Sequence, residues 1–258
     1  MSMLKLNNVF FSYHSLEGEI HALDNISFSV KKGEFLSIVC PSGCGKSTLL
    51  NLIIGLLKPQ NGTISFYEAN SETPSIGYML QHDHLFEWRN IYENVILGLE
   101  IQKKLTSKNK QRIHELLENY GLSAFMYKRP SELSGGMKQR AALIRTLALD
   151  PEILLLDEPF SALDYQTRLM VSSDIGKIIK ENNKTAILVT HNLSEAISMA
   201  DRILVFSSRP STIQSEFNIQ LTISPDDTSP LAYRNAPEYQ SYFNEIWKEL
   251  NHEAKQIA

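Results

Sequence analysis

The sequence contains few cysteines, and both lie in one short segment. Among 258 residues there are only two, Cys40 and Cys44. No cluster of histidine or cysteine lies beside them, so they do not indicate a metal site. A disulfide would distort the loop that contains them, and we therefore expect reduced thiols and a cytosolic protein.

Long apolar runs and a strong charge of one sign are also missing. No run reaches the roughly 18 apolar residues that a membrane-spanning helix needs, and the first residues lack the basic and then apolar pattern of a secretory signal. We expect a chain that neither spans nor crosses a membrane. The net charge of −4 gives no electrostatic reason to expect nucleic acid as the main partner. A chain of this length, 43% apolar, can bury one sizeable core with a smaller subdomain.

The 12 glycines are few, but two glycine-rich segments have the composition of phosphate-binding loops. The first follows an apolar run at residues 35–39 and precedes a helical pattern, which is the strand, loop and helix order that a phosphate loop requires. It comprises Ser42, Gly43, Cys44, Gly45, Lys46, Ser47 and Thr48. Backbone N–H groups and the start of the next helix would hold a polyphosphate, with Lys46 bridging the terminal phosphates and Ser47 ligating Mg²⁺. The alternative is a Gly-Lys-Ser loop that binds no nucleotide.

One residue departs from the G-x-x-x-x-G-K-[ST] pattern. Cys40 stands where the first glycine is expected, and its Cβ crowds the turn from strand to loop. We expect the substitution to be tolerated, because Gly43 and Gly45 remain.

Two carboxylates follow the apolar run at residues 153–156. Asp157 is placed to reach Mg²⁺ through water, and Glu158 to polarise an attacking water. Acidic residues after a strand also cap helices or turns, which is the alternative. His191, after a predicted strand at 187–190, is placed to contact a γ-phosphate or to serve as a structural hydrogen bonder. Gln81, after a predicted strand at 76–80, is placed to touch Mg²⁺ or the water.

The apolar patterns predict an α/β fold with a helical insertion. Short β-branched runs predict strands at residues 4–11, 26–30, 35–39 and 63–66, whereas residues 91–149 have helical spacing throughout. Buried strands at 153–156 and 185–189 alternate with helices at 165–180 and 193–200, which predicts a parallel sheet. After Arg209-Pro210 the chain is polar and irregular until a final amphipathic helix, which we expect to pack on its own core. Its apolar face comprises Tyr239, Tyr242, Phe243, Ile246, Trp247 and Leu250.

These residues together resemble the ATP-binding cassette (ABC) ATPases over about residues 3–210. The motifs occur in the order of that family: Tyr13, the Walker A loop ending in Gly45-Lys46-Ser47-Thr48, Gln81, the signature at residues 133–139 with Ser134, Gly135 and Gly136, the Walker B strand ending in Asp157 and Glu158, the D-loop ending in Asp164, and His191. The resemblance implies a P-loop NTPase (RecA-like) core with an antiparallel β subdomain and an inserted α-helical subdomain at about 91–149. The ATPase domain would span residues 1–210, with a C-terminal tail at 211–258.

The resemblance also implies the site and its partners. Tyr13 would stack on adenine, although core packing is the alternative for this aromatic. Ser134, Gly135 and Gly136 would bind the γ-phosphate of ATP on a second subunit, so that two ATP molecules join a head-to-tail homodimer. The implied catalytic residues are Glu158, His191, Gln81 and Lys46; Ser47, Gln81 and Asp157 would hold Mg²⁺, and Asp164 would join the nucleotide contacts. The partners implied are integral membrane permease subunits and an extracytoplasmic solute-binding protein, with the ATPase peripheral on the inner face of the membrane.

Further residues resemble the branch that serves nitrate, sulfonate, taurine and pyrimidine or riboflavin precursor importers. These are Trp88-Arg89-Asn90, the run at residues 162–168 and Arg209-Pro210. Glu87 stands where the branch usually has proline, and Asn192 where aspartate is commoner. Exposed Trp88 and Arg89 would contact the permease, with local packing of Trp88 as the alternative. Two alternative functions remain. One is a soluble cassette ATPase that is not coupled to transport. The other is a nucleotide-binding regulatory subunit that is weakly active because Cys40 replaces the first glycine of the Walker A loop.

Overall fold

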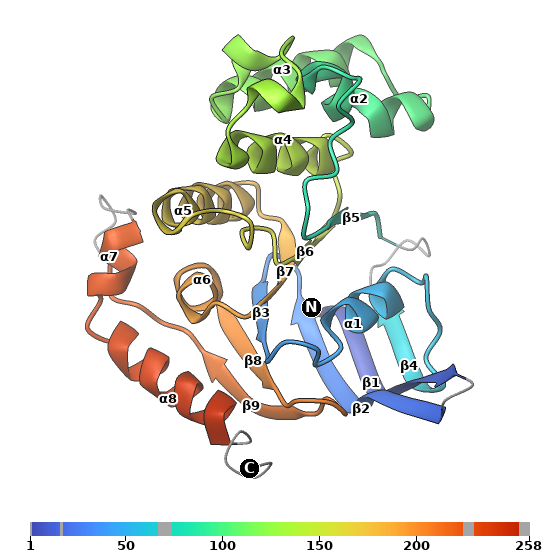
Figure 1. Cartoon of the computed structure of the whole chain (residues 1–258), viewed down its shortest axis with the longest axis vertical. Helices are drawn as coiled ribbons and strands as arrows, with labels where there is room; N and C mark the ends of the chain where they lie inside the picture. The colour runs from blue at the N-terminus through green and yellow to red at the C-terminus, as the bar shows by residue number, and fades with distance from the viewer. Residues whose placement is uncertain (1, 16–17, 67–73, 224–229, 253–258) are drawn as a thin grey trace.

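The computed structural model describes residues 2–15, 18–66, 74–223 and 230–252, which form two lobes (Figure 1). In this part of the chain the strands form two sheets. The smaller is antiparallel with the order β2-β1-β4, comprising β1 (Ser2–Ser15), β2 (Gly18–Lys31) and β4 (Asn61–Phe66). β1 and β2 extend well beyond the apolar runs that predicted them.

The larger sheet has the order β5-β6-β7-β3-β8-β9. Its strands are β3 (Phe35–Val39), β5 (Ile76–Met79), β6 (Ile153–Asp157), β7 (Thr185–Thr190), β8 (Arg202–Phe206) and β9 (Ile213–Asn218). All neighbours pair in parallel except β8 and β9, which are antiparallel. Because β3, β5, β6 and β7 run in one direction, their carboxyl ends and the loops that follow them lie along one edge of the sheet.

The larger sheet is buried on both faces. Alternate residues of β6 belong to different apolar clusters: Ile153 and Leu155 pack on the side of α1 (Lys46–Ile53), whereas Leu154 and Leu156 pack on the other side. This second side is covered by α5 (Tyr165–Glu181) and α6 (Leu193–Met199). Burial on both faces explains why the strands read as unbroken apolar runs.

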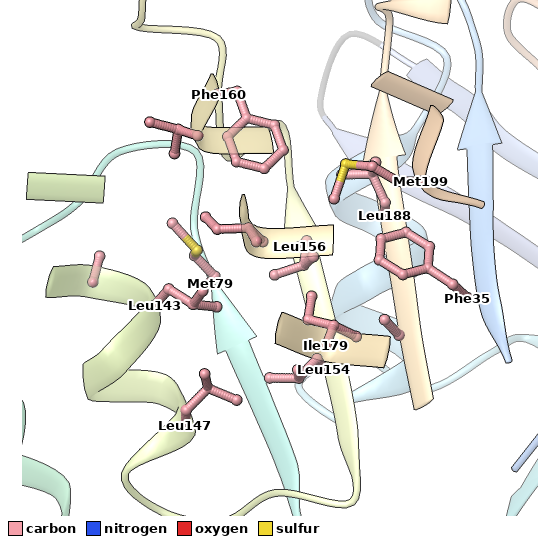
Figure 2. Close-up of a cluster of buried hydrophobic side chains, with 14 of the residues drawn as sticks. Phe35, Met79, Leu143, Leu147, Leu154, Leu156, Phe160, Ile179, Leu188 and Met199 are labelled. Atoms are coloured by element: carbon pink, nitrogen blue, oxygen red, sulfur yellow. The ribbon is translucent and has the colours of Figure 1, made fainter. Parts of the chain in front are cut away.

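The second lobe is helical. It contains α2 (Ile91–Ile101), α3 (Ser107–Asn119), α4 (Gly135–Leu147) and the short 3₁₀ turns η1 (Ser123–Phe125) and η2 (Pro130–Glu132). α4 joins the lobe to the sheet, and Figure 2 shows Leu143 and Leu147 of α4 beside Met79 of β5. Gly77 of β5 permits this approach, because a Cβ there would lie 2.7 Å from the Thr146 side chain.

The predicted fold class is confirmed, but the region after β8 was predicted wrongly. Residues expected to be irregular form the edge strand β9 and the helix α7 (Pro230–Asn235). β9 was missed because alternate residues are exposed and the rest only partly buried, so its hydrophobic signal is weak. β8 was also not predicted, although it is almost fully buried.

The final helix, α8 (Tyr239–His252), packs on the core as expected. Tyr239 and Ile246 are buried, but Trp247, predicted on the same face, is 56% exposed. Phe243 stacks between Tyr239 and Trp247, with ring centroids 6.3 and 6.2 Å away. In the part of the chain that the structure describes, we find no helix with the length and apolarity to span a membrane.

Candidate active site

The phosphate loop connects β3 to α1 and depends on glycine for its shape. Gly43 and Gly45 have φ angles of 80° and 107°, which residues with a Cβ rarely adopt. A Cβ at Gly45 would also lie 3.2 Å from the Ala22 carbonyl of β2. α1 begins at Lys46, so the unpaired N–H groups of its first turn lie at the loop, an arrangement suited to an anion.

The cysteines of this loop are not free thiols. Cys40 and Cys44 form a disulfide across a sequence separation of four, and both are buried. The expectation of reduced thiols was wrong, because the curl of the loop brings the two Cα atoms to 6.3 Å, within the range that a disulfide spans. Gly43 and Gly45 keep their left-handed conformations in the presence of this bond.

Two predicted site residues, Lys46 and His191, meet at a third, Glu158. Lys46 Nζ lies 2.7 Å from Glu158 Oε1, and His191 Nδ1 lies 3.0 Å from Glu158 Oε2. Lys46 and Glu158 are nearly buried, with side chains 11% and 10% exposed, while His191 is half exposed at 51%. The carboxylate therefore holds the loop lysine on one oxygen and leaves a solvent-facing imidazole on the other.

Glu158 occupies a strained backbone position. Its φ is 44°, in the left-handed region that non-glycine residues seldom adopt, and its N–H donates to the Val189 carbonyl at 2.8 Å. Such conformations persist only where neighbouring structure enforces them, and they concentrate at functional sites. The turn directs the carboxylate away from the strand and towards Lys46.

Asp157 lies at the end of β6 beside the loop hydroxyl. Ser47 Oγ donates to Asp157 Oδ2 at 3.1 Å, and the Tyr78 hydroxyl donates to the same oxygen at 3.3 Å. Burial raises the pKa of Asp157, although the hydrogen bonds from Ser47 and Tyr78 oppose the rise. Burial, together with the charge of Asp157, also raises the pKa of Tyr78. Tyr78 was not predicted as a site residue, because an aromatic in a buried strand usually signals packing.

Tyr13 and Gln81 lie at the margins of this cluster. Tyr13 is 42% exposed, so the core-packing alternative does not hold for it. Its hydroxyl lies 3.1 Å from Thr48 Oγ1, and its ring meets the Phe11 ring at a T-shaped angle with centroids 5.0 Å apart, which places a partly exposed aromatic ring beside the start of α1. Gln81 is exposed just after β5, and β5 ends with Met79 opposite Leu156, one residue before Asp157.

The second glycine-rich segment begins α4. Ser134 is the N-cap, and its Oγ accepts from the Met137 amide at 3.4 Å. A Cβ on Gly136 would lie 2.8 Å from the Thr167 methyl of α5, so this glycine lets the two helices approach. Figure 1 shows α4 in the helical lobe and α1 beside the smaller sheet, so the two glycine-rich segments lie in different regions of the molecule.

The D-loop is fixed by a network that was not predicted. Asp164 is the N-cap of α5 and accepts from the Thr167 amide at 3.1 Å. Hydrogen bonds from the Thr167 side chain and then from its amide lower the pKa of Asp164. Arg168 Nη2 donates to the Leu163 carbonyl at 2.8 Å, and Arg168 Nε lies 3.9 Å from Glu195. Glu195 in turn accepts from Thr190 Oγ1 at 2.7 Å, directly before His191.

The profile of the ABC transporter family matches residues 23–161. The chain belongs to this family. An uncharacterized ABC transporter ATP-binding protein of Bacillus subtilis (strain 168), YtlC, is 47% identical over 258 residues, which cover 99% of this chain and 98% of that protein. The taurine import ATP-binding protein TauB of Pelagibacter ubique (strain HTCC1062) is 39% identical over 249 residues, with 95% and 94% covered.

Solved cassettes have the same fold. A dimeric ATP-binding cassette in a post-hydrolysis state, bound to ADP and Pi, has a TM-score of 0.71 at 33% identity and covers 84% of this chain and 99% of its own. The cassette cbiO1 from Clostridium perfringens, part of an ABC transporter complex, has a TM-score of 0.74 at 25% identity, with 99% and 97% covered. As a member of the ABC transporter family with close ATP-binding relatives, the present protein is an ATPase.

The cassette also presents an aromatic loop before α2. Trp88 is 72% exposed, and its ring is tilted by 36° relative to the Phe86 ring, with ring centroids 4.6 Å apart. Asn94, fully buried in α2, fixes this loop: its Oδ1 accepts from the Phe86 amide at 2.7 Å, and its Nδ2 lies within 3.3 Å of the Phe86, Arg89 and Asn90 carbonyls. The indole of Trp88 therefore contacts the Phe86 ring while most of its surface remains accessible.

Proposed function

We propose that the cassette is the ATP-hydrolysing subunit of a membrane importer for small sulfonates of the taurine type. The convergence of Lys46 and His191 on Glu158 carries the catalytic part of this proposal. When ATP enters, Lys46 leaves the carboxylate for the terminal phosphates. Glu158 then accepts a proton from the attacking water, and His191, on the other carboxylate oxygen, orients Glu158 towards the γ-phosphate.

The residues fit a magnesium ion. Ser47 and Asp157 place a hydroxyl and a carboxylate oxygen 3.1 Å apart, and hard oxygen ligands are those that Mg²⁺ takes. A buried carboxylate whose pKa is raised is stabilised in its charged form by a nearby cation. Ser47 and Asp157 would hold the ion, with Gln81 at the margin. The bound ion would neutralise charge on the phosphates.

The second half of the site comes from another copy. Ser134, Gly135 and Gly136 open α4 with unpaired N–H groups, suited to a γ-phosphate on a partner subunit. Asp164 stands at the start of α5 and would contact nucleotide across the same interface. A solved relative that is dimeric with ADP and Pi bound supports the assembly of two copies.

The solute class rests on relatives rather than on the catalytic residues. TauB proteins of Pelagibacter ubique and of Jannaschia sp. (strain CCS1), named for taurine import, are 39% and 38% identical to this chain. Selectivity belongs to the permease and to a solute-binding protein outside the membrane, with the cassette at the inner face. The loop with Trp88 would contact the permease.

Uptake in cells tests the import function. Deleting the gene should abolish accumulation of labelled taurine, and wild-type protein should restore it whereas Glu158→Gln should not. Co-purification with two integral membrane proteins would separate a transporter from a soluble cassette ATPase. Normal uptake of taurine and related sulfonates in the deletion strain would remove this solute class from the proposal.

A further inference from the structure

The connection between β8 and β9 reaches back to the phosphate loop. Arg209 Nε and Nη2 both donate to the Gly43 carbonyl, at 3.0 and 2.7 Å. Two residues later, the Ser211 hydroxyl donates to the Cys44 carbonyl. One segment therefore holds two successive carbonyls of the loop, across sequence separations of 166 and 167 residues.

The segment is itself anchored. The Ser211 amide donates to the Ala22 carbonyl at 3.1 Å, and the Ser211 carbonyl accepts from the Asp24 amide at 2.9 Å, both in β2. Ser211 is fully buried, and Ser207 Oγ lies 3.2 Å from the Pro210 carbonyl and accepts from the Thr212 amide at 2.8 Å. Arg209, in contrast, is exposed. The contacts to the loop thus come from a turn fixed to the smaller sheet.

Holding a carbonyl fixes the amide on the other side of the same peptide. A trans peptide is planar, so its N–H points opposite to its C=O. The peptide held by Arg209 carries the Cys44 N–H, which donates to the Pro41 carbonyl at 3.3 Å and closes the loop on itself. The peptide held by Ser211 carries the Gly45 N–H, which then faces away from Ser211, towards the start of α1 where the phosphates would bind.

We propose that Arg209 and Ser211 are positioning residues that hold the phosphate loop in its nucleotide-binding conformation before nucleotide arrives. The inference rests on the proposed nucleotide site around Lys46. Two charge-assisted hydrogen bonds to one carbonyl are stronger than neutral ones, so the exposed Arg209 is an effective anchor. Gly43 and Gly45 have left-handed backbone conformations, and glycine is conformationally free. Without these anchors, the loop would lose this conformational freedom when nucleotide binds, which would weaken binding.

Equilibrium binding of MgATP to the full chain, together with steady-state ATPase kinetics, tests this role. Arg209→Met should raise the Kd and KM for MgATP about tenfold, and Ser211→Ala about three- to tenfold, with kcat changed less than about twofold. Arg112→Met is the matched control, because it removes the same charge and a hydrogen bond to a backbone carbonyl, that of Leu147, together with an ion pair to Asp150, all away from the phosphate loop. It should leave Kd and KM unchanged.

The variants separate positioning from folding and from charge. A purely structural role would lower the fraction of active protein and kcat while leaving the Kd of the folded fraction unchanged, and that result would overturn the inference. So would full recovery by Arg209→Lys together with normal binding in Ser211→Ala, since the positive charge alone would then act. Lys46→Ala separates a failure of the proposed nucleotide site from a failure of the positioning role. If Lys46→Ala binds MgATP normally, the proposed nucleotide site is wrong. Weak binding in Lys46→Ala together with normal binding in Arg209→Met overturns only the positioning role.

Discussion

The ion pair between Lys46 and Glu158 predicts that one substitution has two separable effects. In the structure, Lys46 Nζ lies 2.7 Å from Glu158 Oε1, and both side chains are nearly buried. Nucleotide must draw Lys46 away from this carboxylate before the lysine can contact phosphate. Glu158→Gln should therefore slow turnover strongly and also tighten nucleotide binding.

The sizes of the two effects follow from the geometry. Unit charges about 4 Å apart attract by about 4 kcal/mol at an effective dielectric of about 20. Desolvation offsets most of this attraction, so we take about 1.4 kcal/mol as the net term, which corresponds to about a tenfold lower Kd for Glu158→Gln. Loss of the carboxylate as general base should lower kcat at least ~100-fold.

MgADP is the ligand that isolates the ion-pair effect. It cannot be hydrolysed, and it lacks the γ-phosphate that would join two subunits, so its Kd reports the competition for Lys46. Calorimetric titration of wild type and Glu158→Gln should show the tenfold tightening, whereas Glu181→Gln, an exposed charge change on α5, should not. Identical MgADP affinities in wild type and Glu158→Gln would refute the competition, and unchanged ATPase turnover would refute the role of Glu158 as base.

Three further predictions concern stability and covalent state. Gly136→Ala should lower the free energy of unfolding by about 1–3 kcal/mol in urea titrations, because the new Cβ would lie 2.8 Å from the Thr167 methyl, and unaltered stability would contradict this packing. Burial would raise the pKa of Asp150, but the hydrogen bond from Lys184 and the charge of Arg112 outweigh it and lower that pKa. Asp150→Asn should therefore lower the free energy of unfolding by at most about 1 kcal/mol at pH 7, and the difference from wild type should vanish as pH falls below the usual carboxyl range. A loss of equal size at pH 2 would count against the ion pairs. Without reductant, Cys40 and Cys44 should resist alkylation in denaturant and react after reduction, as mass spectrometry would detect, and immediate labelling would contradict the disulfide.

Motifs with a fixed spacing were predictable from the sequence, because the backbone itself forms the site. The phosphate loop needs glycine at two positions with positive φ, and the buried strands before Asp157 and His191 need continuous apolar residues. Both requirements are local, so they are visible in the residue pattern. The fold class followed from the same alternation of strands and helices.

Contacts between distant segments could not be predicted in this way. Arg209 meets Gly43 only because β8 lies beside β3 in the sheet, and that order is set by tertiary packing. The disulfide was rejected for the same reason, since the distance between Cys40 and Cys44 depends on the curl of the loop rather than on its composition. β9 was missed because an edge strand with one exposed face has a weak hydrophobic signal.

The buried amide of Asn94 has a consequence for assembly. By tying together the amide of Phe86 and the carbonyls at Phe86, Arg89 and Asn90, it keeps the segment around Trp88 in one shape in the unassembled subunit. A partner that binds the indole would thus contact a segment that is already ordered, so the segment would lose little conformational entropy on docking. A displacement of Trp88 would move α2 with it, because the hydrogen bonds of Asn94 join the segment to this helix.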